Sequence, residues 1–250
     1  MSIGSADYVE VIRAAIERVS TTQRDRVAHA ADLLAATIAA GGVIQAFGCG
    51  HSEALAMEIA GRAGGLVPTN RIALRDIVIY GGEPVGALSD PELERTADIA
   101  HRLYDLASIK PDDTFVIASN SGVNGAVVEM AHLVKQRGHA LIAITSLEHS
   151  ARVPSRHGSG LKLGDLADVV LDNGAPYGDA SLPLPGGGAV GAVSSITAAL
   201  LAQQIVTEAV ARLLALGVTP PVYLSDNVPG GREHNAALEA RYAGRIRRTA

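Results

Sequence analysis

Two short segments carry small polar residues at a spacing suited to holding an anion. They read Gly48-Cys-Gly50-His-Ser52 and Ser119-Asn-Ser121-Gly-Val-Asn124. Each follows an apolar, partly β-branched run, 43–47 or 114–118, and each precedes residues that favour a helix. Unpaired backbone N–H groups and the positive end of a helix dipole meet at such a junction. Both segments therefore predict phosphate-binding loops, although Ser and Asn are also the preferred caps of ordinary helices.

The first segment also partly matches other motifs. A dinucleotide-binding fingerprint needs a third glycine where this chain has Glu53, and no Gly-Lys-Ser/Thr follows to make a P-loop. Gly50-His51-Ser52-Glu53-Ala54 approximates the Gly-x-Ser-x-Gly elbow of serine hydrolases, with Ser52 as the nucleophile. An elbow normally follows several strands, whereas only one clear strand precedes Ser52. The phosphate loop is the favoured interpretation, and the hydrolase is a third hypothesis.

The elements that position these loops alternate between strands and helices. Strands are predicted at 43–47, 72–74, 77–79, 114–118, 140–145 and 168–171. Helices are predicted at 7–19, 22–40, 53–63, 91–107, 126–137 and 194–216, with a short one ending near residue 241. Strands separated by helices indicate an α/β fold whose parallel sheet is covered on both faces. In such a sheet both loops emerge at the carboxyl ends of strands, where ligands bind.

Composition narrows the classes of function. The chain has 250 residues, a net charge of −5 and 48% apolar residues, so nucleic acid and anionic membrane surfaces are not expected partners. The single cysteine cannot form an intramolecular disulfide, and no signal peptide or membrane span is evident. We expect one domain in the cytoplasm. No metal-binding spacing or cofactor motif is present, so we expect neither a metal nor a cofactor.

The two loops together resemble those of the sugar isomerase (SIS) domain of phosphosugar isomerases and phosphosugar-sensing proteins. The likeness covers roughly residues 22–216 and is closest to a branch of stand-alone SIS proteins that share Gly-His-Ser and a Val-Pro-Gly-Gly-x-Glu-His-Asn stretch, here residues 228–235. It implies a three-layer, flavodoxin-like sandwich with a five-stranded parallel sheet. The single domain would comprise N-terminal helices (1–40), a sheet-helix core (43–216) and a C-terminal tail (217–250). The implied phosphate- and sugar-binding residues are Gly48, Gly50, His51, Ser52, Ser119, Asn120, Ser121, Gly122 and Asn124.

The resemblance also implies a reaction, aldose–ketose isomerisation by proton transfer between C1 and C2. Glu58 is the candidate base, since Glu58-x-x-Gly61-Arg62 resembles a phosphoheptose isomerase motif, although there the glutamate lies about one helical turn further from the serine. The alternative is an i,i+4 ion pair with Arg62. Glu233 is a second candidate base, and His51 or His234 would assist ring opening. A non-catalytic phosphosugar-binding or sensing protein is the alternative function.

The predicted N-terminal helices indicate that the protein is an oligomer. They carry apolar residues at helical spacing, at Val9, Ile12 and Ile16 and again at Val27, Leu34 and Ile38. One sheet needs only part of that surface, so a homodimer or homotetramer is expected. The resemblance implies that paired subunits share sites. We therefore expect a histidine of one copy to reach the phosphosugar site of another, with His234 favoured over His51.

Overall fold

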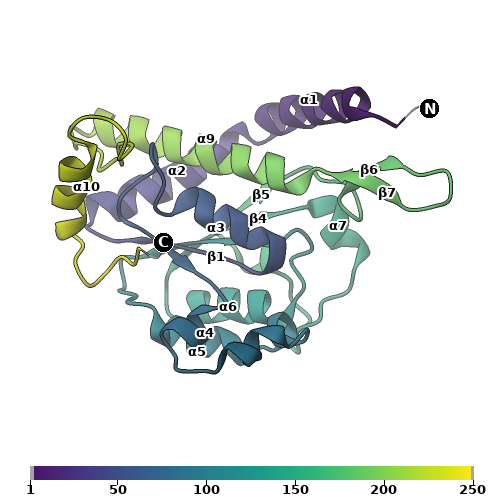
Figure 1. Ribbon diagram of the computed structural model, residues 1–250, viewed down its shortest axis with the longest axis horizontal. Helices are drawn as coiled ribbons and strands as arrows, with labels where there is room; N and C mark the ends of the chain where they lie inside the picture. Colours follow the sequence, from purple (N-terminus) through teal and green to yellow (C-terminus); the bar gives the residue numbers. More distant parts are fainter. Residues whose placement is uncertain (1–2, 249–250) are drawn as a thin grey trace.

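The computed structural model describes residues 3–248 and has a five-stranded parallel sheet at its centre (Figure 1). The strand order is β2-β1-β3-β4-β5. The strands are β1 (Ile44–Gly48), β2 (Thr69–Ile72), β3 (Thr114–Ala118), β4 (Ala140–Thr145) and β5 (Val169–Asp172). All five residues of β1 and of β3 are buried, as expected for central strands of a sheet covered on both faces. The predicted SIS-like α/β fold with additional N-terminal helices is confirmed.

Helices cover both faces of this sheet. On one face, α2 (Arg24–Ala39), α3 (Glu53–Ile59) and α9 (Ser194–Ala215) pack on strand residues such as Val116 and Ile142. On the other face, α4 (Asp76–Ile79), α5 (Ile99–Leu106), α6 (Gly125–Gln136) and α8 (Leu163–Leu166) pack on Phe115 and Ile117. Alternate residues of β3 therefore enter different cores, as the two-residue repeat of a strand requires. Outside these layers, α1 (Ser5–Thr22) contacts α9 and the hairpin described below.

By length and composition, α9 is apolar enough to cross a bilayer. In this structure its buried side chains, including Leu201, Ile205 and Leu213, pack against α2, α3 and the sheet. The helix therefore has the position of a core helix in the layered fold.

Several predicted elements differ from those observed. The helix predicted at 53–63 ends at Ile59, because Ala60 is extended and Gly61 has a φ of 77°. The chain after it pairs instead with a distant segment, as the backbone of Gly64 and Gly65 bonds to that of Tyr223. Residues 77–79 belong to the helical turn α4 rather than to a strand, since the Asp76 carboxylate accepts the backbone N–H of Ala73 at the start of that turn (3.1 Å).

Two predicted connections contain regular structure, and one predicted helix is shorter than expected. The loop 146–166 includes α7 (Leu147–Arg152) and α8, while the Pro/Gly-rich segment before α9 forms an antiparallel hairpin of β6 (Ala180–Pro183) and β7 (Ala189–Ala192). Of the helix predicted at 91–107, α5 and a 3-10 turn at Leu93–Arg95 are present. The hairpin projects from the carboxyl ends of the strands, at the right of Figure 1.

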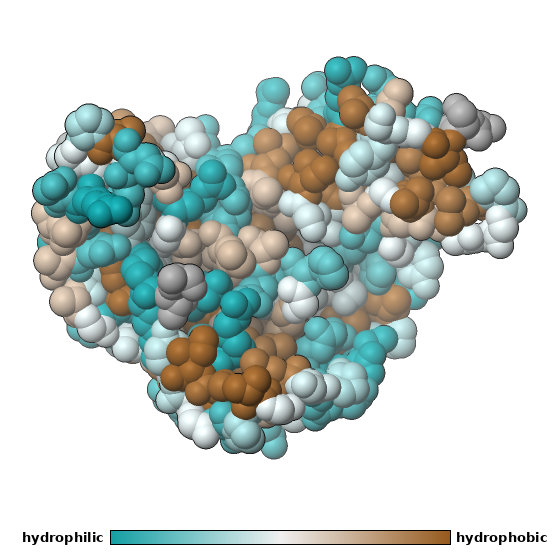
Figure 2. Space-filling view, viewed as in Figure 1, coloured by the Kyte–Doolittle hydropathy of each residue, from teal (hydrophilic) through white to brown (hydrophobic). Residues whose placement is uncertain are grey.

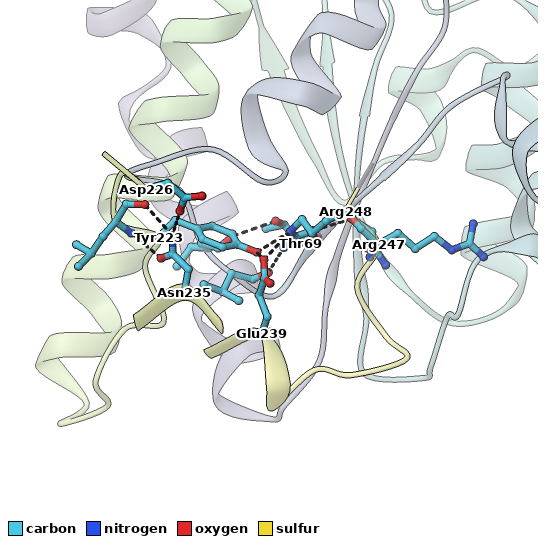
Figure 3. Close-up of polar contacts among 11 residues, drawn as sticks. Thr69, Tyr223, Asp226, Asn235, Glu239, Arg247 and Arg248 are labelled. Carbon is cyan, nitrogen blue, oxygen red and sulfur yellow. Dashed lines mark hydrogen bonds and ion pairs between the residues drawn. The ribbon is translucent and has the colours of Figure 1, made fainter. Parts of the chain in front are cut away.

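The C-terminal segment lies at the opposite end of the sheet. Helix α10 (Gly231–Ala240) and the chain after it pack beside the amino ends of β2 and β3 (Figure 1). Figure 3 shows Arg248 reaching from this tail to the hydroxyl of Tyr223 and to the backbone carbonyl of Thr69. The Tyr223 hydroxyl in turn donates to Glu239 of α10 (2.7 Å). These contacts hold the tail at the amino ends of the strands, whereas the predicted phosphate loops follow the carboxyl ends.

Candidate functional site

A cavity of about 290 Å³ lies at the carboxyl ends of β1 and β3, beside the N-terminal ends of α3 and α9. Both predicted phosphate loops contribute to it. Its polar lining residues are His51, Ser52, Glu58, Ser119, Asn120, Asn173, Asp179, Ser194 and Ser195. The remaining lining is apolar, from residues such as Leu55, Ile144 and Ala198. An apolar cleft with converging polar groups at the strand ends is the usual form of a small-molecule site in α/β folds.

The first loop turns sharply because its glycines permit it. A side chain at Gly48 would place its Cβ 2.3 Å from the backbone oxygen of Ser52, so only glycine fits there. Ser52 is the N-cap of α3, yet its side chain makes no capping hydrogen bond. Its backbone is ordinary helical (φ −71°, ψ −11°), unlike the strained turn of a nucleophile elbow. The Ser52 hydroxyl thus lines the cavity without serving either as a cap or as an elbow nucleophile.

The second loop places two hydrogen-bond donors in the cavity wall. The Ser119 hydroxyl oxygen accepts the backbone N–H of Gly122 (3.1 Å), which leaves its proton free to donate. The Asn120 carbonyl oxygen accepts the side-chain amide of Asn173 (3.1 Å), which leaves the Asn120 NH₂ group for a ligand. Together with Ser52, these residues form a surface that we call the donor end of the cavity: Ser52, Ser119 and Asn120.

The other predicted residues of the second loop are near the cavity but do not line it. Gly122 adopts a φ of 67° and allows the loop to turn. The Asn124 side chain donates to Glu94 (3.0 Å) and accepts from Arg156 (3.1 Å), so it is occupied by protein contacts. Ser121 is half-buried outside the lining residues.

Glu58 lies in the cavity wall and is held by two donors. Its Oε1 accepts the side-chain amide of Gln203 on α9 (2.6 Å) and also pairs with the guanidinium of Arg62. Both contacts engage the same carboxylate oxygen. The predicted ion pair with Arg62 is therefore present, and Glu58 nevertheless lines the cavity.

The candidate histidines lie at opposite ends of the parallel sheet. His51 is exposed and lines the cavity. His234 and Glu233 lie on α10, and the His234 imidazole contacts the backbone carbonyl of Val222 (3.0 Å). Since α10 packs near the amino ends of the strands, these two residues do not reach the cavity of their own chain (Figure 1).

Cys49 lies inside the first loop, but its surroundings keep the thiol protonated. Burial, followed by the negative charges of Glu94 and Glu53, raises the pKa of Cys49 to about 12. A thiol with this pKa is a poor nucleophile, so Cys49 acts as a small apolar residue. Within residues 3–248, no group of three or more His, Cys, Asp or Glu side chains has the geometry of a metal site.

Four polar residues of the cavity were not predicted from the sequence: Asn173, Asp179, Ser194 and Ser195. Asn173 follows β5 just as Ser119 follows β3, so its position after a predicted strand could have indicated a cavity residue. The two serines begin the long helix α9, which also had a recognisable start. Asp179 gave no such sign, because it lies within a Pro/Gly-rich connection.

Comparisons with known proteins agree with this fold. The SIS domain model matches residues 7–146. A UPF0309 protein of Listeria monocytogenes is 42% identical over 240 residues, covering 96% of this chain and 97% of that protein. A UPF0309 protein of Geobacillus kaustophilus is 36% identical, covering 96% and 94%.

Two solved structures share the fold. Phosphoheptose isomerase of Neisseria gonorrhoeae has a TM-score of 0.54 and 20% identity, covering 83% of this chain and 96% of its own. The phosphoheptose isomerase of Francisella tularensis has a TM-score of 0.55 and 16% identity, covering 83% and 98%. At these identities the likeness concerns the fold alone.

Proposed function

The chain belongs to the SIS domain family, and from that premise and the geometry of the cavity we propose that it binds a phosphorylated sugar and interconverts the aldose and ketose forms. The observation that carries the proposal is the donor end. The side-chain oxygens of Ser119 and Asn120 each already accept a hydrogen bond within the protein, and Ser52 makes no capping bond. Three side chains are thus available to donate to a ligand that offers acceptors, as phosphate oxygens do.

Phosphorylated sugars are expected to stabilise the fold, whereas the corresponding free sugars are not, because the donor end supplies much of the affinity. A ligand at a hundredfold excess over its Kd adds about 2.7 kcal/mol to the free energy of unfolding. Thermal unfolding with a panel of sugar phosphates measures this effect. Ser52→Ala should reduce the shift strongly, while Ser121→Ala, outside the cavity lining, should retain it. The absence of any shift at millimolar sugar phosphate would contradict the proposal.

The cavity also contains groups suited to isomerisation. Glu58 would take the proton from C2 of the open-chain aldose and return it to C1, while the C2 hydroxyl proton moves to the oxygen on C1. The free Oε2 of Glu58 is the basic atom, since Oε1 is engaged by Gln203 and Arg62. Ring opening needs a second proton donor and acceptor, and the candidates are His51 of the same chain and His234 of a second copy.

We further propose that the chain forms a homodimer. Figure 2 shows apolar surface over α1, α9 and the β6–β7 hairpin, and exposed apolar side chains of these elements include Val9, Val190 and Ile196. Between 39% and 47% of each of these three side chains is exposed. Exposed apolar patches of this kind are typical of a protein interface. Sharing of sites would explain why His234 and Glu233 lie far from the cavity of their own chain.

A mixing experiment is expected to show whether sites are shared. A His234→Ala chain and a Ser52→Ala chain, each inactive alone, should regain activity when they are unfolded and refolded together. Random pairing would make roughly a quarter of the sites whole in such a two-fold assembly. Light scattering provides the control for assembly. A His234→Ala chain with full activity, or a monomer that binds ligand normally, would contradict this arrangement.

A further inference from the structure

Asp179 has an unusual backbone conformation at the edge of the cavity. It is the only non-glycine residue within 3–248 that has a left-handed φ, at 69°. Its side chain faces the beginning of α9, where Oδ1 accepts the backbone N–H groups of Val193 (3.1 Å) and Ser194 (2.7 Å). Its Oδ2 accepts the hydroxyl proton of Ser194 (2.8 Å). Asp179 and Ser194 both line the cavity that contains the donor end.

This hydrogen bond determines what Ser194 can offer to a ligand. A serine hydroxyl has one proton, and here that proton is directed to Asp179, so the Ser194 oxygen can only accept. The Asp179 carboxylate likewise only accepts, and its three protein donors leave part of its capacity unused. We call Asp179 and Ser194 the acceptor end. One cavity thus presents donors from the loops after β1 and β3, and acceptors from the β5–α9 connection (Asp179) and the first residue of α9 (Ser194).

We propose that the acceptor end is the subsite for the hydroxyl-bearing part of the ligand. This inference rests on the proposed function, which places a phosphate at the donor end. Hydroxyl groups of the ligand would then donate to Ser194 and to Asp179, and an amino group would do so equally. The ligand class is a phosphate monoester whose carbon chain carries hydrogen-bond donors, rather than one with an apolar chain.

A purely structural role for Asp179 leads to a different expectation. A carboxylate at a helix N-terminus stabilises the helix, and its loss costs stability whatever ligand is present. A subsite for hydroxyl groups instead discriminates between ligands that share the phosphate and differ only in the chain. Selectivity among ligands is therefore the informative measurement, while melting temperatures of the ligand-free variants report on the cap.

The experiment uses titration calorimetry with three probes: inorganic phosphate, n-butyl phosphate, and the tightest-binding member of a panel of tetrose to heptose phosphates. Wild-type protein should bind the sugar phosphate more tightly than n-butyl phosphate. Ser194→Ala should weaken sugar phosphate binding about tenfold and leave the other two probes unchanged. Asp179→Asn should do the same, since asparagine tolerates the left-handed backbone. Ser181→Ala, a hairpin serine outside the cavity lining, is the matched control.

Two results would overturn the inference while leaving phosphate binding intact. One is wild-type protein that binds n-butyl phosphate as tightly as every sugar phosphate. The other is Ser194→Ala protein that retains full affinity for the sugar phosphate, or loses affinity equally for all three probes. Wild-type protein that binds none of the probes would overturn both this inference and the proposed function. If Asp179→Asn fails to fold, Ser194→Ala decides alone, because it keeps both backbone bonds of Asp179.

Discussion

Replacing Glu58 by glutamine is expected to lower the rate of C1/C2 proton exchange by about 10²–10⁴, the usual contribution of a general base. Glutamine has nearly the same shape and can still accept from Gln203, so the cavity wall should be preserved. It lacks the basic oxygen that takes the proton. Binding of sugar phosphate should therefore persist while exchange is lost. Proton NMR in deuterated water, with the sugar phosphate that best stabilises the wild-type chain, measures the exchange.

Two further variants make this result specific. Glu233→Gln changes a carboxylate on α10 that does not line the cavity of its own chain, and it should leave exchange intact. If exchange instead persists in Glu58→Gln and disappears in Glu233→Gln, the base comes from α10 of a second copy. If the wild-type chain binds sugar phosphates and catalyses no exchange with any of them, the protein is a phosphosugar-binding or sensing protein.

The phosphate loops could be predicted because their chemistry is local in the sequence. In each loop, a buried strand, a turn and a helix start occur within about a dozen residues. Because β1 and β3 are adjacent and parallel, their carboxyl ends place the two loops side by side. Ser52, Ser119 and Asn120 accordingly lie in one cavity. Gly48 illustrates how strict this local code is, because any side chain would overlap the backbone of Ser52.

The acceptor end could not be predicted because it depends on contacts between distant residues. Asp179 and Ser194 are separated by the whole β6–β7 hairpin, which resembles an irregular Pro/Gly-rich connection in the sequence. The early end of α3 could not be predicted for the same reason. The residues after it favour a helix by composition, but the backbone of Gly64 and Gly65 pairs instead with the distant Tyr223. Local propensity is a weak predictor where tertiary pairing competes with it.

The second large effect is expected in the C-terminal tail, because a buried ion pair holds this tail against the sheet. The Asp113 side chain is completely buried just before β3, and it pairs with Arg245 of the tail (2.6 Å). The same carboxylate accepts the backbone N–H groups of Val43 (2.9 Å) and Lys110 (3.0 Å) and the side-chain amide of Gln45 (2.9 Å). Asp113 thus joins the starts of β1 and β3 to Arg245, which lies 132 residues further along the chain.

Arg245→Ala is expected to lower the free energy of unfolding by about 3 kcal/mol, because it leaves the buried Asp113 carboxylate without its countercharge. The remaining three donors to Asp113 are neutral, so they cannot replace the guanidinium. Equilibrium unfolding in urea measures the change. Arg241→Ala, which removes an exposed arginine from the same tail, should have little effect. The donor end lies at the carboxyl ends of the strands, away from the tail. Folded Arg245→Ala protein should therefore bind sugar phosphate normally. A stability equal to that of wild type would mean that Asp113 is held by its neutral donors alone.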